Sequence, residues 1–304
     1  MRQESTISVL DLPAGKLQVM GYSTEMIENV SSEEMSAQSV EHPLLPVSAP
    51  SAIDVGVQLS LVIPAYNEES RLRSTLEKAI DFLAISHPLF ELLMVDDGSS
   101  DSTVEIATEF SRHDPRIKVI SIPHAGKAAA VRAGMNAATG QFVAFTDADL
   151  ATPLSYLTDF VTIASNGADV VIGSREGMGS RRIGEPWYRH FMGRVFNRMV
   201  QMLVLPGIED TQCGFKLFRQ KSIRTILDRA LLYQEIQAVV GPRVTAFDVE
   251  LLVIARSLGF TIVTEPVVWT YGTNSKVNPI RDTLHNAFDI LRIKRNMLSK
   301  RYRS

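Results

Sequence analysis

The most constraining feature of this chain is a regular alternation of short apolar runs with helical patterns, beginning near residue 58. Five apolar runs predict strands: LSLVIPAY (59–66), FELLMVD (90–96), RIKVISIP (116–123), QFVAFTDADL (141–150) and ADVVIGSR (168–175). Apolar residues at helical spacing predict helices between them, at 71–85, from 102 onward and at 126–140. Apolar strands separated by helices are typical of a parallel sheet covered on both faces. The sequence therefore predicts an α/β fold with a mostly parallel sheet flanked by helices.

Polar clusters follow these strands at the points where each is predicted to end. The clusters are PAYNEE, DDGSSD, PHAGK, TDADL and GSRE. The carboxyl ends of parallel strands meet at one edge of a sheet, and open α/β sheets bind their ligands at that edge. One such cluster has little meaning, but five at one edge predict a binding site rather than a set of solvated turns.

Three short signals predict where helices begin or end. The spacing of Ser102 and Glu105 is typical of a capping box that opens a helix. Gly140 is predicted to close the Ala-rich third helix. After the fourth strand, Thr152 is predicted to cap the next helix, with Pro153 at its first position, where a missing N–H has no cost.

Beyond residue 175 the pattern is less regular. The Gly- and Arg-rich stretch 176–186 is predicted to be a mobile loop. The remaining predictions are an amphipathic helix at 187–205, a turn into a strand at 210–219, a helix at 245–259, a strand at 260–271 and a final helix that opens at Asn278-Pro279.

Charge divides the chain into three regions. Residues 1–56 hold eight acidic residues against two basic ones and lack lasting periodicity, which is typical of a disordered tail. Residues 57–277 carry the alternation and are predicted to form a single catalytic domain. Residues 278–304 hold seven basic residues against two acidic ones and are predicted to form a basic amphipathic helix.

Composition excludes several classes of protein. The net charge of −3 argues against a nucleic-acid-binding surface. The single cysteine, Cys213, rules out an intrachain disulfide and is predicted to be a small buried side chain. No apolar run approaches the roughly 18 residues that a membrane span requires, and the N-terminus lacks the pattern of a signal peptide. We therefore expect a cytoplasmic protein, and nothing in the sequence indicates its oligomeric state.

Asp147 and Asp149 stand one residue apart at the predicted end of the fourth strand. The alternation of a strand would point both carboxylates in one direction. Two carboxylates suit Mg²⁺ or Mn²⁺, which prefer oxygen and often complete their shell with substrate phosphates. Taken alone, the pair fits the N-terminus of a helix better. Its position among four sister clusters at the end of a parallel strand favours metal binding.

Other residues of these clusters have two explanations each. Asp96 or Asp97 would accept a hydrogen bond from the ring N–H of uracil or guanine, or belongs to an ordinary turn. Lys127 follows a glycine at a helix start, where backbone N–H groups favour a phosphate, but this signal is weak alone. Tyr66 would stack on a base, or forms a wall of the core.

Six motifs, in order, resemble those of family 2 glycosyltransferases with the GT-A fold: VIPAYNEE, VDDGSSDST, GKAAAVRAG, TDADL, GSR and DTQCGFKLF. The resemblance covers about residues 58–295 and indicates the branch that transfers a sugar to dolichyl or polyprenyl phosphate. DTQCGFKLF together with FDVELL is closer to the dolichyl-phosphate β-glucosyltransferases than to the mannosyl branch. The resemblance implies an inverting transfer from a nucleotide sugar without a covalent intermediate.

The resemblance also implies roles for individual residues. The nucleotide sugar would be bound by Pro64, Ala65, Tyr66, Glu68, Asp96, Asp97, Lys127, Asp147 and Ala148. The metal ion, Mg²⁺ or Mn²⁺, would be held by Asp147 and Asp149. The acceptor phosphate would be met by Arg175, Arg189, Gln212 and Lys216. The catalytic residues would be Asp149, Arg175 and Asp248, of which Asp248 is either a base or a group that positions the donor.

The chain departs from the family pattern in three ways. His124-Ala-Gly-Lys-Ala128 stands where the family often has Asn-x-Gly-Lys-Gly. Ala151 follows DADL where the mannosyl branch often has Gln, which favours UDP-glucose as the donor. No transmembrane anchor is found. The alternatives are GDP-mannose as donor, a soluble acceptor, a sugar nucleotidyltransferase and a non-catalytic relative, although the last would be expected to lack one DxD acid.

A lipid acceptor implies contact with a membrane surface. The basic final helix is explained either by a solvated face or by attraction to anionic lipid, about 1 kcal/mol per basic residue near the surface. The helix 188–205 either rests at the interface or packs in the core, through Trp187, Phe191, Phe196, Met199 and Met202. We expect peripheral association with the cytoplasmic face of a membrane.

Overall fold

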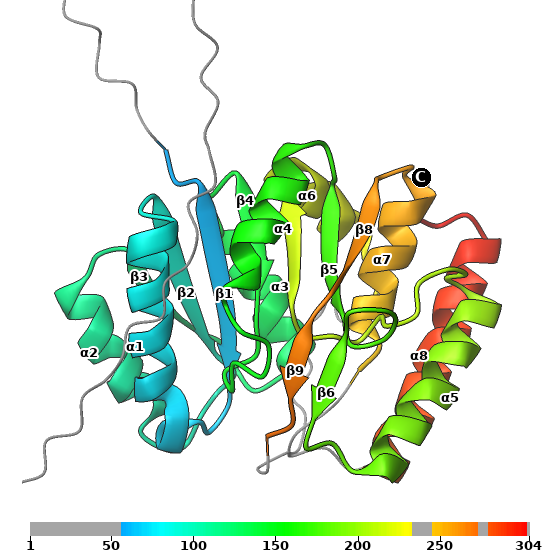
Figure 1. Ribbon diagram of the computed structural model, residues 1–304, viewed down its shortest axis with the longest axis horizontal. Coiled ribbons are helices and arrows are strands. Elements are labelled where there is room, and N and C mark those ends of the chain that lie inside the picture. Colours follow the sequence, from blue (N-terminus) through cyan, green and yellow to red (C-terminus); the bar gives the residue numbers. More distant parts are fainter. Residues whose placement is uncertain (1–55, 233–244, 273–278, 303–304) are drawn as a thin grey trace, which may run out of the picture. The chain divides into compact units, whose positions relative to one another are not determined.

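The computed structural model describes residues 56–232, 245–272 and 279–302, without the side chains of 279–285 (Figure 1). The chain divides into Met1–Ala52 and Ile53–Ser304, and only the second part contains described residues. The predicted acidic tail therefore lies outside the described residues, apart from Gly56.

A seven-stranded sheet forms the centre of the domain. Its strands are β1 (Leu59–Ala65), β2 (Phe90–Asp96), β3 (Ile117–Ser121), β4 (Phe142–Phe145), β5 (Val170–Ser174), β7 (Lys216–Arg219) and β8 (Ile262–Pro266). Their order is β3-β2-β1-β4-β7-β5-β8, and β7 alone runs antiparallel to its neighbours within this sheet. The predicted mostly parallel sheet is confirmed.

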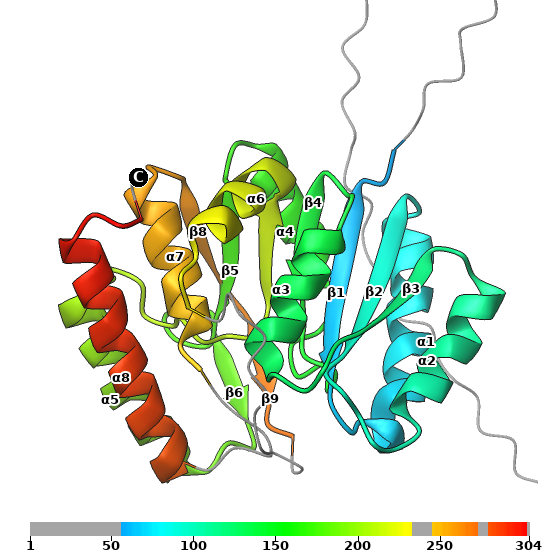
Figure 2. The same ribbon diagram turned by 180° about the vertical axis from the view of Figure 1, so that it is seen from behind.

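Helices cover both faces of this sheet, as Figures 1 and 2 show from opposite sides. They are α1 (Glu69–Ser86), α2 (Thr103–His113), α3 (Lys127–Ala137), α4 (Tyr156–Ser165), α6 (Gln220–Arg229) and α7 (Phe247–Ser257). Alternate strand residues feed two separate cores, so that Leu61 and Ile63 of β1 pack with α1 and α4 while Val62 packs with α3. The apolar runs were continuous because both faces of the sheet are buried.

A two-stranded parallel sheet, β6 (Arg181–Ile183) with β9 (Val268–Thr270), lies beside the main one. The prediction of a mobile loop at 176–186 was wrong at β6, where Arg182 pairs with Glu176 at 2.9 Å and with Glu185 at 2.7 Å. The strand predicted at 260–271 is divided in two. β8 ends at Pro266, the Val267 N–H still donates to the Ser174 carbonyl at 2.9 Å, and β9 begins at Val268.

Two long helices, α5 (Trp187–Leu203) and α8 (Pro279–Leu298), pack against each other at one end of the domain (Figures 1 and 2). Both helices were predicted. Phe196 is buried and Met199 packs on the core, so only part of the predicted interface set on α5 faces outward. Among the described residues, no helix is sufficiently long and apolar to cross a membrane.

Two of the predicted helix ends differ in the structure. Ser102 makes no side-chain cap; instead Asp101 accepts from the Thr103 N–H at 3.1 Å. The third helix ends at Ala137, before Gly140. A Cβ at Gly140 would lie 2.7 Å from the Ser60 nitrogen, so this glycine permits a close backbone approach rather than a cap.

The helix after β4 also begins later than predicted. It starts at Tyr156, because a turn in which the Leu157 N–H donates to the Leu154 carbonyl at 2.8 Å intervenes after Pro153. Thr152 is buried and makes no cap. Helix α6 was not predicted at all, since it follows β7 directly with no turn residue between them, although Ile223, Ile226 and Leu227 have helical spacing.

Candidate functional site

The five polar clusters lie after the ends of β1 to β5, which are mutually parallel through the sheet. In Figure 1 this edge is the lower one. The fold therefore gathers at one edge the clusters that are up to about a hundred residues apart in sequence. This is the edge at which open α/β sheets bind ligands.

Asp147 and Asp149 lie in a turn just beyond β4, not in the strand. The strand ends at Phe145, and the Leu150 N–H donates to the Asp147 carbonyl at 3.0 Å. Leu150 has a φ of 47°, and the Ala151 N–H donates to Asp149 Oδ1 at 3.0 Å. The prediction that the alternation of a strand orients the two carboxylates was therefore wrong. A hydrogen-bonded turn, rather than a pleat, sets how the two carboxylates are held.

Lys127 Nζ forms an ion pair with Asp147 Oδ1. Burial lowers the pKa of Lys127, but the charges of Asp147, Asp248 and Asp149 raise it, and the net pKa lies above its usual value. Lys127 is therefore a permanent cation at neutral pH. The side chains of Lys127 and Asp147 are 37% and 39% exposed, so this end of the cluster is open to ligands.

Asp149 is held in a less polar setting than its neighbour. Burial, followed by the charge of Asp147, raises the pKa of Asp149 above its usual value. Two like charges in a partly buried turn repel each other, and a bound cation would relieve both effects. This is the electrostatic arrangement expected of a cation site.

Two glycines lie beside this turn, one of them in very close contact with it. A Cβ at Gly214 would lie 2.1 Å from Asp147 Oδ2, and one at Gly272 would lie 3.4 Å from Asp149 Oδ2. Gly214 belongs to the DTQCGFKLF motif. Any side chain there would displace the Asp147 carboxylate, so the motif contributes to the site by leaving space.

Lys216 and Asp248 form a buried ion pair behind the turn. Their Nζ and Oδ1 atoms are 3.1 Å apart, and Lys216 has no exposed surface. Burial raises the pKa of Asp248, and the nearby charges of Lys216 and Lys127 lower it by less. Lys216 also donates to the Cys213 carbonyl. These contacts favour a structural role for Lys216 beside Asp248 over direct contact with an acceptor phosphate.

The residues predicted to line the nucleoside lie together at the ends of β1 and β2. Pro64 and Ala65 pair with Val95 and Asp96 across the two strands. The Ala148 carbonyl accepts from Thr75 at 2.6 Å.

Tyr66 is already stacked on His124, with ring centroids 4.0 Å apart and planes within 8°. No role in base binding was predicted for His124 from the sequence. Glu68 forms an ion pair with Arg71 at 2.8 Å.

The two acids of VDDGSSDST hold backbone. Asp97 accepts from the N–H groups of Ala125 and Gly126 and from His124 Nδ1, at 2.8 to 3.1 Å. Asp96 accepts from the N–H groups that follow it at 3.1 and 3.2 Å. Since both are 2% exposed, each shapes a loop at the site. Their contact with a base stays a prediction.

Arg175 and Arg189 lie over aromatic rings at the end of β9, Arg175 over Trp269 in the strand and Arg189 over Tyr271 just after it. Arg175 donates from Nε and Nη2 to Asp210 at 2.7 and 2.9 Å, and the completely buried Asp210 holds the pKa of Arg175 well above its usual range. Arg189 Nη1 donates to the Tyr271 hydroxyl at 3.0 Å. The Gln212 N–H donates to Asp210 Oδ1 at 3.3 Å, which keeps this residue close to the pair.

Asp210, Trp269 and Tyr271 were not predicted from the sequence as residues of the site. Asp210 begins the DTQCGFKLF motif, so the sequence drew attention to this residue but did not show that it pairs with Arg175. The alternation Trp269-x-Tyr271 was read only as strand pattern. These three residues contact Arg175 or Arg189, which lie far from them in the chain.

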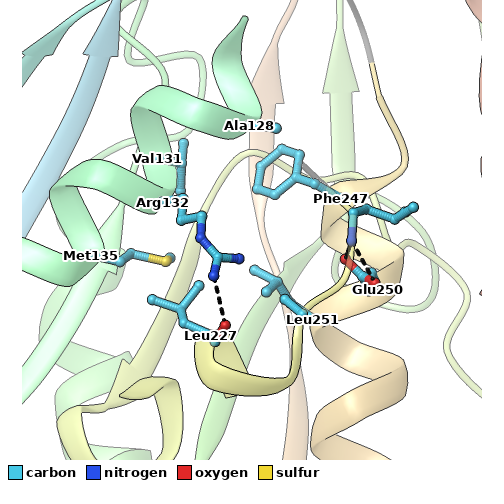
Figure 3. A pocket seen from close by; sticks show the side chains of 10 residues that line it. Ala128, Val131, Arg132, Met135, Leu227, Phe247, Glu250 and Leu251 are labelled. Atoms are coloured by element: carbon cyan, nitrogen blue, oxygen red, sulfur yellow. Dashed lines mark hydrogen bonds between the residues drawn. The ribbon is translucent and has the colours of Figure 1, made fainter. Parts of the chain in front are cut away.

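A void beneath α3 is too small to be the ligand site. Its volume is about 20 Å³, which suits at most a single water. Figure 3 shows Arg132 reaching between Leu227 and Leu251, with its Nη2 donating to the Leu227 carbonyl at 2.8 Å. The carboxylate of Glu250 in the same view accepts backbone N–H groups.

Comparison with known proteins gives the family. The model described as "Glycosyl transferase family 2" matches residues 60–227. The chain belongs to this family. It is 32% identical over 281 residues to the dolichyl-phosphate beta-glucosyltransferase of Dictyostelium discoideum, covering 88% of this chain and 82% of that protein. It is 33% identical over 263 residues to the Homo sapiens protein of the same name, covering 81% and 78%.

These matches confirm the predicted resemblance and establish a glycosyltransferase rather than a sugar nucleotidyltransferase. Among solved structures, glucosyl-3-phosphoglycerate synthase from Mycobacterium tuberculosis in complex with uridine diphosphate superimposes with a TM-score of 0.54. The identity is 19%, over 79% of this chain and 80% of that one. This likeness concerns the fold alone and confirms the GT-A architecture.

Proposed function

We propose that the protein transfers glucose from UDP-glucose to the phosphate of a dolichyl or polyprenyl phosphate, with inversion at the sugar carbon. The observation that carries this proposal is the arrangement around β9. The Asp147–Asp149 turn lies beside the end of this strand and the residues that follow it. The guanidinium of Arg175 lies over Trp269 in the strand, and that of Arg189 lies over Tyr271 just after it. The carboxylate pair would bind an anionic donor through a metal ion, and the two arginines would bind an anionic acceptor. The relatives named dolichyl-phosphate beta-glucosyltransferase support the choice of sugar and acceptor.

The donor would lie across the ends of β1, β2 and β4. We place the nucleoside against Pro64, Ala65, Tyr66, Glu68, Asp96, Asp97 and Ala148, as the family resemblance implies. Lys127 would meet the diphosphate, because it is a cation at a helix start where backbone N–H groups also favour phosphate.

The residues of the turn fit a divalent metal ion. Within the described part of the chain, no three His, Cys, Asp or Glu side chains gather as a complete metal site. Two carboxylates nevertheless suit Mg²⁺ or Mn²⁺, which use substrate phosphates for the remaining positions. Asp147 and Asp149 would hold the ion, which would neutralise charge on the leaving diphosphate. The mycobacterial enzyme of the same fold was crystallised with Mn²⁺ and UDP.

In the transfer, a phosphate oxygen of the acceptor bonds to C1 of glucose, and the bond from C1 to the diphosphate oxygen breaks. The electron pair of that bond leaves with UDP. A phosphate monoester has its second pKa near 6, so the nucleophile is already largely ionised at neutral pH and needs little help from a base. We assign Arg175 and Arg189 to bind the acceptor phosphate, with Gln212 close by, and Asp248 to position the donor.

A lipid acceptor requires the protein to reach a membrane surface, and α5 and α8 suit this. We define the docking face as their exposed apolar and basic residues: Trp187, Tyr188, Phe191, Arg194, Val195, Arg198, Met202, Phe288, Leu291, Arg292, Arg295 and Leu298. On each helix the apolar members recur at helical spacing and so form a stripe. Apolar side chains with basic neighbours and no exposed acid among the described residues of these helices suit an anionic lipid surface.

One plate of thermal melts tests the donor. The protein is heated with Mn²⁺ and, separately, UDP-glucose, UDP-galactose, GDP-mannose, UDP or GDP. We expect UDP and UDP-glucose to raise the melting temperature and GDP-mannose to have no effect. Stabilisation by GDP-mannose alone would replace glucose by mannose in the proposal.

A transfer assay tests the acceptor. Radiolabelled UDP-glucose is incubated with Mn²⁺ and either dolichyl phosphate, dolichol or 3-phosphoglycerate. Label is expected to enter the organic phase only with dolichyl phosphate, and EDTA is expected to prevent it. Transfer to 3-phosphoglycerate alone would identify a soluble acceptor.

A further inference from the structure

Strand β9 and the two residues after it connect the two halves of the site. The Thr270 N–H donates at 2.8 Å to the carbonyl of Ala151, which follows the DxD turn. A Cβ at Gly272 would lie 3.4 Å from Asp149 Oδ2. The backbone of this segment is therefore fixed against the turn that carries the paired carboxylates.

The side chains of the same segment hold the two arginines. The Arg175 guanidinium lies over the Trp269 ring, 5.3 Å from its centroid, and that of Arg189 lies over Tyr271 at 5.1 Å. Arg189 also donates to the Tyr271 hydroxyl at 3.0 Å. The centroids of the two rings are 6.0 Å apart. Residues two apart in an extended chain point to the same side, which brings together arginines from different elements.

We propose that Trp269 and Tyr271 are positioning residues that hold Arg175 and Arg189 at the acceptor phosphate, at a fixed place relative to the Asp147–Asp149 turn. This inference rests on the proposed function and deepens it. A ring face beneath a guanidinium orients the cation without accepting any of its N–H hydrogen bonds. An arginine without such support must lose rotamer freedom when the phosphate binds.

The two rings are not explained by core packing. The two apolar cores of the described residues contain neither Trp269 nor Tyr271, and both side chains are partly exposed. Arg175 is anchored by Asp210 as well, whereas the hydroxyl of Tyr271 is a specific anchor of Arg189. Loss of that hydroxyl therefore tests the idea with least disturbance to the fold.

The experiment is a double-mutant cycle with Tyr271→Phe and Arg189→Ala. The KM for dolichyl phosphate and the Kd for UDP with Mn²⁺ are measured for each variant. Tyr271→Phe is expected to raise the acceptor KM about three- to tenfold and to leave the UDP Kd unchanged. In the Arg189→Ala background the same change is expected to have no further effect on the acceptor KM. An equal effect in both backgrounds, or an equal loss of UDP affinity, would overturn the proposal.

Trp269 is tested by Trp269→Leu against Trp269→Phe. Leucine removes the ring and is expected to raise the acceptor KM at least fivefold, whereas phenylalanine keeps a ring and is expected to restore most of the loss. If Trp269→Leu fails to fold, the Tyr271 cycle decides alone. A wild-type protein that transfers to no polyprenyl phosphate overturns both this proposal and the proposed function. Transfer with unchanged acceptor KM in the Tyr271 and Trp269 variants overturns the positioning role only.

Discussion

Asp149 shows at the level of one residue how the fold holds a carboxylate in an unfavourable setting. Its pKa is raised by burial and then by Asp147, so the ionised carboxylate is less stable in the folded protein than in an unfolded chain. The hydrogen bond that its Oδ1 accepts from the Ala151 N–H offsets only part of this cost, since the net pKa is still raised. Ligand binding would explain why the fold keeps a carboxylate that lowers its stability.

Asp149→Ala is therefore expected to abolish transfer without weakening the fold. In the proposed metal site, loss of one ligand would remove several kcal/mol of transition-state stabilisation, so turnover should fall by roughly 100-fold or more. The melting temperature of the ligand-free protein should be unchanged or slightly higher. Undiminished activity with Mn²⁺ would contradict the metal assignment.

Gly214→Ala is expected to weaken Mn²⁺-dependent UDP binding, because its Cβ would lie 2.1 Å from Asp147 Oδ2 and would displace that carboxylate. Gly193→Ala is the matched control, since a Cβ there meets nothing within 4 Å. Calorimetric titration of UDP with Mn²⁺ measures both. Equal affinity of the Gly214 variant and the control would show that the Asp147 carboxylate does not bind the ligand.

Among the helices and strands, the sequence predicted the five parallel strands and most helices because each one carries its own period of apolar residues. It misplaced the features that depend on distant partners. The β6 strand forms on β9, about 85 residues away, and Arg182 is held there by two glutamates. The start of α4 was misplaced for a local reason instead, because a turn after Pro153 delays the helix to Tyr156.

The end of α8 is fixed to α7 through one hydroxyl. Tyr302 donates to Glu250 Oε1 at 2.8 Å and accepts from Asn296 at 3.2 Å, and the Glu250 carboxylate also holds the N–H groups of Leu231 and Leu232. Tyr302→Phe should lower the free energy of unfolding by about 1–3 kcal/mol, because a buried carboxylate loses a donor. Urea denaturation measures the change. A loss below the error of the method would show that Glu250 is satisfied without it.

The docking face belongs to two helices and is tested on them together. Phe191→Asp with Leu291→Asp adds two charges where the exposed side chains are apolar. Binding to vesicles that contain phosphatidylserine should fall at least tenfold, since each change both removes apolar contact and repels anionic lipid. Ile85→Asp on α1, an exposed apolar site away from these helices, is the control. Equal binding of all three proteins would contradict the membrane role of α5 and α8.

For the molecule as a whole, the described residues begin at Gly56, and the family match begins only at residue 60. Removal of residues 1–50 should therefore leave the melting temperature of the domain and its transfer activity in solution largely unchanged. Differential scanning calorimetry and the transfer assay measure these. Loss of the folding transition would show that the acidic segment belongs to the domain.

The sheet, the gathering of the polar clusters at one of its edges and the family could all be predicted from the order of residues. These depend on periodicity and on the succession of motifs, which are properties of neighbouring residues. How the motifs act on one another became visible only in the folded chain. Gly214 makes space for Asp147, Asp210 holds Arg175, and β9 with the residue after it joins the DxD turn to both arginines. Such contacts join residues tens of positions apart, so no local pattern encodes them, and only folding brings them within interaction distance.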